Sequence, residues 1–442
     1  MVIGFDGSRA FQKDRTGTEN YSYQLLKALA KIDKKNKYIV YLRSCTVTPG
    51  SPSVTLIRRL AEKGIITPAI YPSANHLRMT REKTRNDKKD WPANFQFKKI
   101  KWLRLWTQGG LAAQTFKDKL DVLFVPAHTL PIVRRPGLKT VVTVHDLGSQ
   151  YLPSMHQLKQ RLYLSYMQKF QLKTATKIIA VSKATKQDLI QRVGIKPDKI
   201  SVVYEGYDRK LFYNKKNLFK SFKSDLVVNS LRWYGLKPGS YFLFVGTVQP
   251  RKNLERLIRA FSVILNPPLA GEGSLANAST TETSPEILRF AQNDNFKLAI
   301  AGSKGWLSDE IYKLPKKLGI GERVKFLGYV PDENLPVLYS GAVAFTFPSL
   351  FEGFGLPILE AQASGCPVLT SNVSSMPEVG GKGAIYVDPY SIDDIVKGIR
   401  KLQRVPEGEG YRSQLIKQGF ENVKRFSWEK CAWETLEVLL SS

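Results

Sequence analysis

Short apolar runs alternate with amphipathic segments along most of this chain of 442 residues. Apolar runs of this length are typical of parallel strands buried on both faces, and the segments between them have helical spacing. The predicted strands of the first half are 2–5, 38–42, 122–125, 140–144, 177–181 and 200–204; those of the second half are 242–245, 297–301, 324–326, 342–347, 367–370 and 384–387. The alternation predicts an α/β fold of two Rossmann-like, doubly wound domains that face a central cleft.

The length of the chain favours at least two domains. We predict an N-terminal domain over residues 1–205, joined by a C-terminal helix over 428–442, and a second domain over 206–427. Two segments, 65–95 and 266–295, interrupt the alternation because they are polar and lack periodicity. We predict that both are flexible insertions.

Two carboxylates flank a glycine-rich turn in the second half. Glu352 follows the predicted strand 342–347, and Glu360 lies in the first turns of the helix behind that turn. Ligands bind α/β sheets at this kind of strand-to-helix junction, where a carboxylate can accept hydrogen bonds from sugar or ribose hydroxyls. The alternative for Glu360 is an ordinary first-turn acid favoured by the helix dipole.

Two adjacent cations, Arg251 and Lys252, follow the predicted strand 242–245 at the start of another helix. Arg can hold phosphate oxygens through two hydrogen bonds and Lys adds a point charge, so the pair can bind a diphosphate. The alternative is a solvated basic turn in which Thr247 or Asn253 caps the helix.

These two motifs together carry a resemblance to a known family. Gly246-Thr-x-x-Pro-Arg-Lys-Asn253 and the Glu352-x7-Glu360 signature are similar to those of the retaining glycosyltransferases of family 4, which have the GT-B fold. The resemblance implies a nucleotide-diphosphate sugar as donor and transfer of a mannose- or glucose-type hexose. It also implies a saccharide or lipid-linked acceptor in the synthesis of cell-surface glycans. Retention of the anomeric configuration is part of the same implication.

The resemblance also assigns roles to individual residues. Arg251 and Lys252 would stabilise the departing diphosphate; because the sequence has no Asp-x-Asp motif, we expect them to act without a metal or other cofactor. Glu352 would accept hydrogen bonds from the donor sugar, and His145 would lie near its hydroxyls, the alternative being a core or capping histidine. The implied donor-binding residues are Gly17, Gly246, Thr247, Arg251, Lys252, Tyr329, Val330, Glu352, Gly353, Phe354, Gly355, Leu356 and Glu360.

Two of the first-domain assignments are weaker. The family loop that would contain Gly17 often has two or three glycines, and here it has one. Ser182, after the predicted strand 177–181, resembles part of another family motif, but we expect it to be a helix N-cap.

The net charge of +29 belongs entirely to the first half. Residues 1–250 contain 45 Lys and Arg against 16 Asp and Glu, whereas residues 251–442 contain 22 of each. Segments 97–106 and 158–173 mix cations with Trp, Tyr and aliphatic side chains, a pattern typical of membrane interfaces. The alternative for both is an ordinary amphipathic helix on the sheet. We therefore expect an anionic membrane surface as partner and consider nucleic acid unlikely, since no nucleic-acid-binding motif accompanies the charge.

The remaining features bear on location and class. No apolar run reaches the roughly 18 residues of a membrane helix, and the N-terminus lacks the features of a signal peptide. The three scattered cysteines are typical of a reduced compartment. We predict a cytoplasmic enzyme, peripheral on the inner face of the membrane. The alternatives are a nucleotide-sugar epimerase of GT-B fold and a non-catalytic protein that binds sugar nucleotides or nucleic acid.

Overall fold

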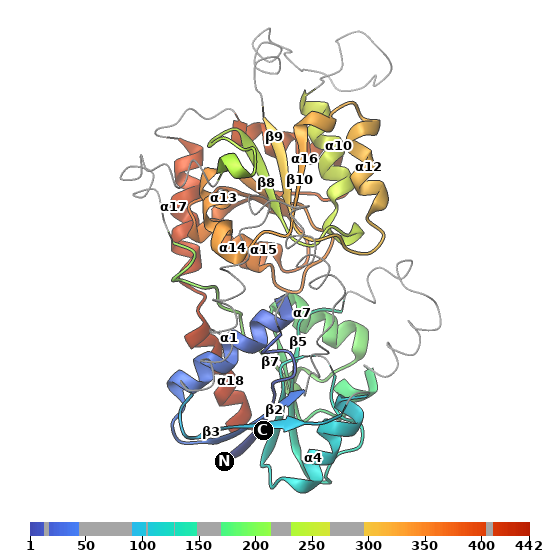
Figure 1. Ribbon diagram of the computed structural model, residues 1–442, viewed down its shortest axis with the longest axis vertical. Coiled ribbons are helices and arrows are strands. Elements are labelled where there is room, and N and C mark those ends of the chain that lie inside the picture. Colours follow the sequence, from blue (N-terminus) through green and yellow to red (C-terminus); the bar gives the residue numbers. More distant parts are fainter. Residues whose placement is uncertain are drawn as a thin grey trace, which may run out of the picture. The chain divides into compact units, whose positions relative to one another are not determined.

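The computed structural model describes residues 1–12, 17–43, 91–102, 105–127, 129–147, 169–213, 231–265, 296–403 and 410–442 (Figure 1). Contacts between Cα atoms divide the chain into two compact units. The first comprises Met1–Val142, Thr174–Lys177 and Leu436–Ser442, and the second comprises Thr143–Lys173 and Ile178–Thr435. The domain boundaries drawn from the sequence stay a prediction. The predicted insertion 266–295 and residues 65–90 of the other one lie outside the described residues.

Two parallel sheets confirm the predicted α/β class. The seven-stranded sheet has the order β3-β2-β1-β4-β5-β6-β7 and the six-stranded sheet has the order β10-β9-β8-β11-β12-β13. The strands of the first sheet are β3 (Phe95–Ile100), β2 (Lys37–Arg43), β1 (Val2–Asp6), β4 (Val122–Val125), β5 (Lys139–Val144), β6 (Lys177–Ala180) and β7 (Ile200–Val202). Those of the second are β10 (Val324–Gly328), β9 (Lys297–Ala301), β8 (Tyr241–Val245), β11 (Ala344–Phe347), β12 (Val368–Ser371) and β13 (Ala384–Val387).

The strand order of the second sheet shows where along its edge a ligand is expected to bind. The chain builds outward from β8 through β9 to β10, then returns to the other side of β8 with β11. β8 and β11 are therefore parallel neighbours, with Ala344 beside Phe242, although β9 and β10 separate them in sequence. Such a reversal of strand order is where doubly wound sheets bind ligands, outside the carboxyl ends of the strands.

Helices cover both faces of the second sheet (Figure 1). In Figure 1, α10, α12 and α16 lie on one side and α13, α14 and α17 on the other. The helices of this part of the chain are α10 (Leu254–Leu265), α12 (Asp309–Lys317), α13 (Leu335–Gly341), α14 (Leu356–Ala363), α15 (Met376–Gly380), α16 (Ile392–Gln403), α17 (Tyr411–Val423) and α18 (Trp428–Leu440). Those before β8 are α1 (Gly17–Ile32), α4 (Ala112–Lys117) and α7 (Lys183–Asp188).

The sequence pattern explains why these elements form. All four residues of β11 are buried, as expected for a central parallel strand with helices on both faces. α10 buries Leu254, Leu257, Ile258 and Phe261, the three-and-four spacing of an amphipathic helix that packs by one side. The predicted strands and helices next to the site are thus confirmed to within a few residues.

Residues 97–100 of the predicted segment 97–106 differ from one of its two interpretations, the amphipathic helix; the interpretation as a membrane interface stays a prediction. Phe95–Ile100 form β3 at the edge of the first sheet, so an amphipathic helix is wrong for these residues. The side chain of Phe95 stacks on Tyr38 of β2, with ring centroids 4.1 Å apart, and Lys98 pairs with Asp118 at 2.8 Å. Aromatic packing between neighbouring strands thus accounts for part of the aromatic content. Of the second stretch, residues 158–168 lie outside the described residues.

A helix that spans a bilayer needs about 20 mostly apolar residues. Among the described residues, none of the helices is long and apolar enough to span a membrane.

Candidate functional site

The site begins at the carboxyl end of β8. After Val245 the chain passes through Gly246, whose φ of +148° suits glycine, and enters a single 3-10 turn over Pro250–Lys252. Asn253 then adopts a left-handed conformation, with φ 60°, and its side-chain amide donates to the Pro348 carbonyl at 2.9 Å. This link ties the basic turn to the segment that follows β11.

Glu352 meets both cations of that turn. Lys252 Nζ lies 2.6 Å from Glu352 Oε1, and Arg251 Nη1 lies 3.5 Å from Glu352 Oε2. The backbone of the two segments is also joined, because Leu350 N–H donates to the Arg251 carbonyl at 2.9 Å. The structure therefore brings together Arg251, Lys252 and Glu352, three of the residues predicted for catalysis.

Burial strengthens the interaction of Lys252 with Glu352. Each residue is only 7% exposed, and Lys252 Nζ also lies 4.9 Å from the centre of the Phe347 ring. Burial lowers the pKa of Lys252, and the Glu352 carboxylate opposes part of that shift. A buried cation held by one carboxylate is suited to an incoming anion, because a diphosphate can share or replace that partner.

Glu360 lies in α14 and is held by a second helix. The fully buried Tyr339 of α13 donates its hydroxyl to Glu360 Oε2 at 3.0 Å. The pKa of Glu360 is raised to about 7, mainly by burial; the Tyr339 hydrogen bond opposes this shift, and the charges of Asp332 and Asp208 add to it. Glu360 is thus a half-buried acceptor, which fits a neutral hydroxyl ligand better than an anion.

Hydrogen bonds from the segment after β12 hold the turn between Glu352 and Gly355 in place. Ser375, after β12, donates to the Phe354 carbonyl at 2.7 Å and to the Glu352 carbonyl at 2.9 Å. Ser374 also donates to the Glu352 carbonyl, at 2.5 Å. The predicted residues Gly353, Phe354 and Gly355 are buried, and Leu356 is the first residue of α14.

His145 and Asp146 follow β5 and lie against the same turn. A Cβ atom at Gly353 would overlap the His145 carbonyl oxygen, so only glycine fits there. Asp146 Oδ2 lies 3.6 Å from Arg251 Nη1. The His145 Nδ1 atom is 3.1 Å from Glu205 Oε1, a contact that orients the imidazole ring.

Ser182 supports this arrangement as the predicted N-cap of α7. Its Oγ accepts from the Thr185 N–H at 3.0 Å, which confirms the cap, and donates to the Gly353 carbonyl at 2.7 Å. Thr185 Oγ1 lies 3.3 Å from both the Gly353 and the His145 carbonyl oxygens. The start of α7 therefore anchors the close approach of His145 and Gly353.

For the other predicted residues, the structure gives the position in the chain and the exposure. Thr247 is exposed beside Gly246. Tyr329 and Val330 follow the edge strand β10, with Tyr329 63% exposed and Val330 buried. Gly17 is the exposed first residue of α1 in the first unit, and residues 13–16 of its loop lie outside the described residues.

Some supporting residues are absent from the prediction. Ser374 and Ser375 follow the strand predicted over 367–370, so their position at a carboxyl strand end was a usable signal. Glu205 follows the predicted strand 200–204, where the sequence alone does not distinguish a turn from a site residue, and Tyr339 lies in an apolar helix that gives no sign of a polar role. Within the described parts of the chain, no group of three or more His, Cys, Asp or Glu side chains is placed to hold a metal ion.

Comparison with known proteins agrees with this geometry. Residues 235–421 match the family model for glycosyl transferases group 1, and residues 15–211 match the model for glycosyltransferase family 4. O-antigen chain mannosyltransferase B of Escherichia coli is 31% identical over 300 residues, which are 68% of this chain and 70% of the relative.

Two solved structures share the fold at low sequence identity. Sucrose-phosphate synthase from Thermosynechococcus elongatus has a TM-score of 0.66 and 18% identity, covering 100% of this chain and 98% of that chain. Anabaena Alr3699/HepE in complex with UDP and glucose has a TM-score of 0.64 and 16% identity, covering 100% and 99%. The chain therefore belongs to glycosyltransferase family 4, is a glycosyltransferase of the group 1 type, and has the GT-B fold.

Proposed function

We propose that this enzyme transfers a mannose- or glucose-type hexose from a nucleotide-diphosphate sugar to a saccharide or lipid-linked acceptor in the synthesis of cell-surface glycans. The observation that carries the proposal is the buried contact of Lys252 with Glu352, with Arg251 beside it, where β8 and β11 meet. The Escherichia coli relative is named as an O-antigen chain mannosyltransferase, and the Anabaena structure contains UDP and glucose. Both support a nucleotide-sugar donor and a glycan product.

In the proposed reaction, the diphosphate that becomes more negative as it departs is bound by the basic turn. Arg251 and Lys252 stabilise the diphosphate as it departs, without a metal ion or other cofactor. Glu352 accepts from hydroxyls of the transferred sugar, beside the backbone of the 353–355 turn, and His145 lies near the same sugar. We propose that the product retains the anomeric configuration, as the family resemblance implies.

The remaining proposed contacts with the donor come from four segments of the chain. Glu360 accepts from the ribose hydroxyls, for which its half-buried carboxylate is suited. The segment at Tyr329 and Val330 holds the base, Gly246 and Thr247 approach the diphosphate, and Gly17 comes from the glycine loop of the first unit.

A nucleotide-sugar screen by thermal unfolding tests the donor assignment. A ligand that binds only the folded protein stabilises it by about 2.7 kcal/mol at a concentration of 100 times its Kd. We expect GDP-mannose or UDP-glucose to raise the unfolding temperature by several degrees, and the corresponding nucleoside monophosphate to raise it much less because it lacks the second phosphate. An equal shift with the monophosphate would contradict the diphosphate site.

Product analysis then separates the enzyme classes. With the donor from the screen and no acceptor, a transferase leaves the donor sugar unchanged apart from slow hydrolysis. An epimerase releases a different sugar under the same conditions, and a non-catalytic protein binds the donor but never forms product with any acceptor. Transfer to a saccharide or lipid-linked saccharide supports the proposal.

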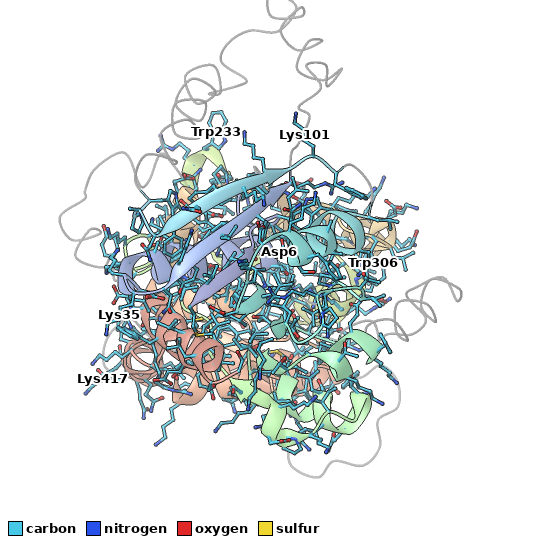
Figure 2. The ribbon with its side chains drawn as sticks, turned by 90° about the horizontal axis from the view of Figure 1, so that it is seen from below. Asp6, Lys35, Lys101, Trp233, Trp306 and Lys417 are labelled. Carbon is cyan, nitrogen blue, oxygen red and sulfur yellow. The ribbon has the colours of Figure 1, made fainter. Side chains whose placement is uncertain are left out.

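We also propose that the first unit binds an anionic membrane surface, which would hold the enzyme near a lipid-linked acceptor. Near β3 and α4, apolar and basic side chains are exposed together: Trp102 is 46%, Leu105 77% and Phe116 53% exposed. Exposed lysines accompany them at Lys99, Lys101, Lys117 and Lys119, and Lys101 points away from the ribbon in Figure 2. Trp beside Lys suits the headgroup region of a bilayer.

Vesicle sedimentation tests the membrane proposal. At low salt, we expect the protein to sediment with anionic vesicles and to be released at high salt, since screening weakens exposed charges. Replacing Lys99 and Lys101 with Glu should weaken binding at least tenfold, because each surface cation contributes about 1 kcal/mol. The control replaces Lys316 and Lys417, exposed lysines of the second unit, with Glu. Equal losses in both variants, or equal binding to neutral vesicles, would reject this surface.

A further inference from the structure

Tyr339 is placed to control the orientation of Glu360. Its side chain is fully buried, and its ring lies edge-on to Phe345 and Phe212, with centroid distances of 5.3 and 6.1 Å. The hydroxyl donates to Glu360 Oε2 at 3.0 Å. Because the ring is packed in the core, the hydroxyl cannot turn away from the carboxylate without opening that core. Tyr339 is thus a fixed donor to Glu360.

The charges around Glu360 make this donor important. Burial is the main effect that disfavours the ionised carboxylate, the charges of Asp332, from the segment before α13, and Asp208 add to it, and the pKa of Glu360 rises to about 7. The Tyr339 hydrogen bond opposes these effects. Burial and the charge of Glu360 raise the pKa of Tyr339 well above its usual range, so the phenol keeps its proton and remains the donor.

We propose that Tyr339 is a positioning residue that orients Glu360 toward the ribose of the donor and sets the pH range over which the donor binds. The proposal rests on the ribose-binding role of Glu360 in the proposed function. The hydroxyl of Tyr339 occupies Oε2 and leaves Oε1 to accept from the ribose. Hydrogen bonds to an ionised carboxylate are roughly twice as strong as those between neutral groups, so donor binding depends on the charge that Tyr339 favours.

The sign of the pH effect follows from these contacts. The donor binds more tightly at a pH above the pKa of Glu360. Its affinity falls as the pH falls through about 7, since protonation of Glu360 removes the charged acceptor. Removing the Tyr339 hydroxyl removes a contact that favours the ionised form, so the pKa of Glu360 rises. In Tyr339→Phe, the loss of affinity should therefore begin at a higher pH than in the unmodified protein.

The test is calorimetric titration of the full chain with GDP-mannose and UDP-glucose between pH 6 and pH 9. The diphosphate of a nucleotide sugar does not titrate in this range, and the uracil and guanine bases begin to lose a proton only near its upper end. A change in affinity between pH 6 and pH 8 is therefore caused by the protein, and the Tyr241→Phe control accounts for the base at higher pH. For the probe that binds, we expect Tyr339→Phe to raise the midpoint of the pH profile by about one unit. Affinity near pH 7 should then fall up to about tenfold, with the difference shrinking at pH 9.

Tyr241→Phe is the matched control. Tyr241 is also fully buried, and its hydroxyl donates to the carbonyl of Leu338, the residue before Tyr339, at 2.6 Å. This variant loses a similar buried hydrogen bond without touching Glu360. We expect a comparable fall in unfolding temperature for the two variants but an unshifted pH profile for Tyr241→Phe.

Glu360→Gln separates the two proposals. We expect this variant to bind the donor more weakly and without the transition near pH 7, since its amide does not titrate. If Glu360→Gln binds both probes as well as the unmodified protein does, the ribose-binding role of Glu360 fails and the role of Tyr339 fails with it. If Glu360→Gln weakens binding but Tyr339→Phe keeps the unshifted profile of the Tyr241→Phe control, only the role of Tyr339 is overturned.

Discussion

Replacing Lys252 with alanine should lower turnover at saturating donor at least a hundredfold. The side chain is buried within 2.6 Å of Glu352, so its charge acts where water screens it poorly. We propose that this charge meets the negative charge that develops on the departing diphosphate. Losing such a preorganised group typically costs about 3 kcal/mol of transition-state stabilisation. Steady-state rates at saturating donor measure the effect apart from weaker donor binding.

A second consequence of Lys252→Ala must be separated from the first. The variant leaves Glu352 buried with Arg251 at 3.5 Å but without its closer partner, and losing one partner of a buried ion pair destabilises a fold by about 3–5 kcal/mol. The double variant Lys252→Ala, Glu352→Gln removes that charge, so folding stability should partly recover while turnover stays low. Arg259→Ala is the control: Arg259 is a half-buried cation of α10 that pairs with Glu255. Normal turnover in Lys252→Ala would rule out the diphosphate role.

Much of this site could be predicted because parallel strands place their carboxyl ends on one edge of a sheet. Arg251 and Lys252 follow the predicted strand 242–245, and Glu352 follows the predicted strand 342–347. The sequence therefore predicts two polar loops on that edge. The direct contact of Lys252 with Glu352 depends on a further fact, the insertion of β11 beside β8. Strand order is a property of the whole sheet, and the local pattern around either residue does not contain it.

Contacts that depend on packing could not be predicted. Tyr339 has the sequence context of a core residue in an apolar helix, and only the packing of α13 against α14 brings its hydroxyl to Glu360. Residues 97–100 of the predicted segment 97–106 show the opposite error, since one interpretation of their aromatic and basic side chains was an amphipathic helix, and that helix is wrong. Their backbone pairs with β2 instead, and the Phe95 ring stacks on that strand.

Gly353→Ala should also lower turnover about a hundredfold, although it adds only one methyl group. The new Cβ would overlap the His145 carbonyl oxygen and would lie 3.0 Å from Asp146 Cβ. The backbone of Gly353 and that of His145 must then move apart. This costs more than moving the flexible end of a side chain. Overpacking of this kind costs about 1–3 kcal/mol of folding stability, so the unfolding temperature should fall as well.

The larger effect on rate follows from what Gly353 holds in place. Its carbonyl accepts from Ser182 Oγ at 2.7 Å, and its neighbour Glu352 faces Lys252. A shift of about 1 Å in such a turn can cost about a hundredfold in rate, because Glu352 and His145 would no longer face the same sugar. The control is Gly321→Ala, whose Cβ would meet nothing closer than the Lys316 Cα at 4.0 Å. Unchanged turnover in Gly353→Ala would mean that catalysis does not need His145 and the 352–355 turn at this separation.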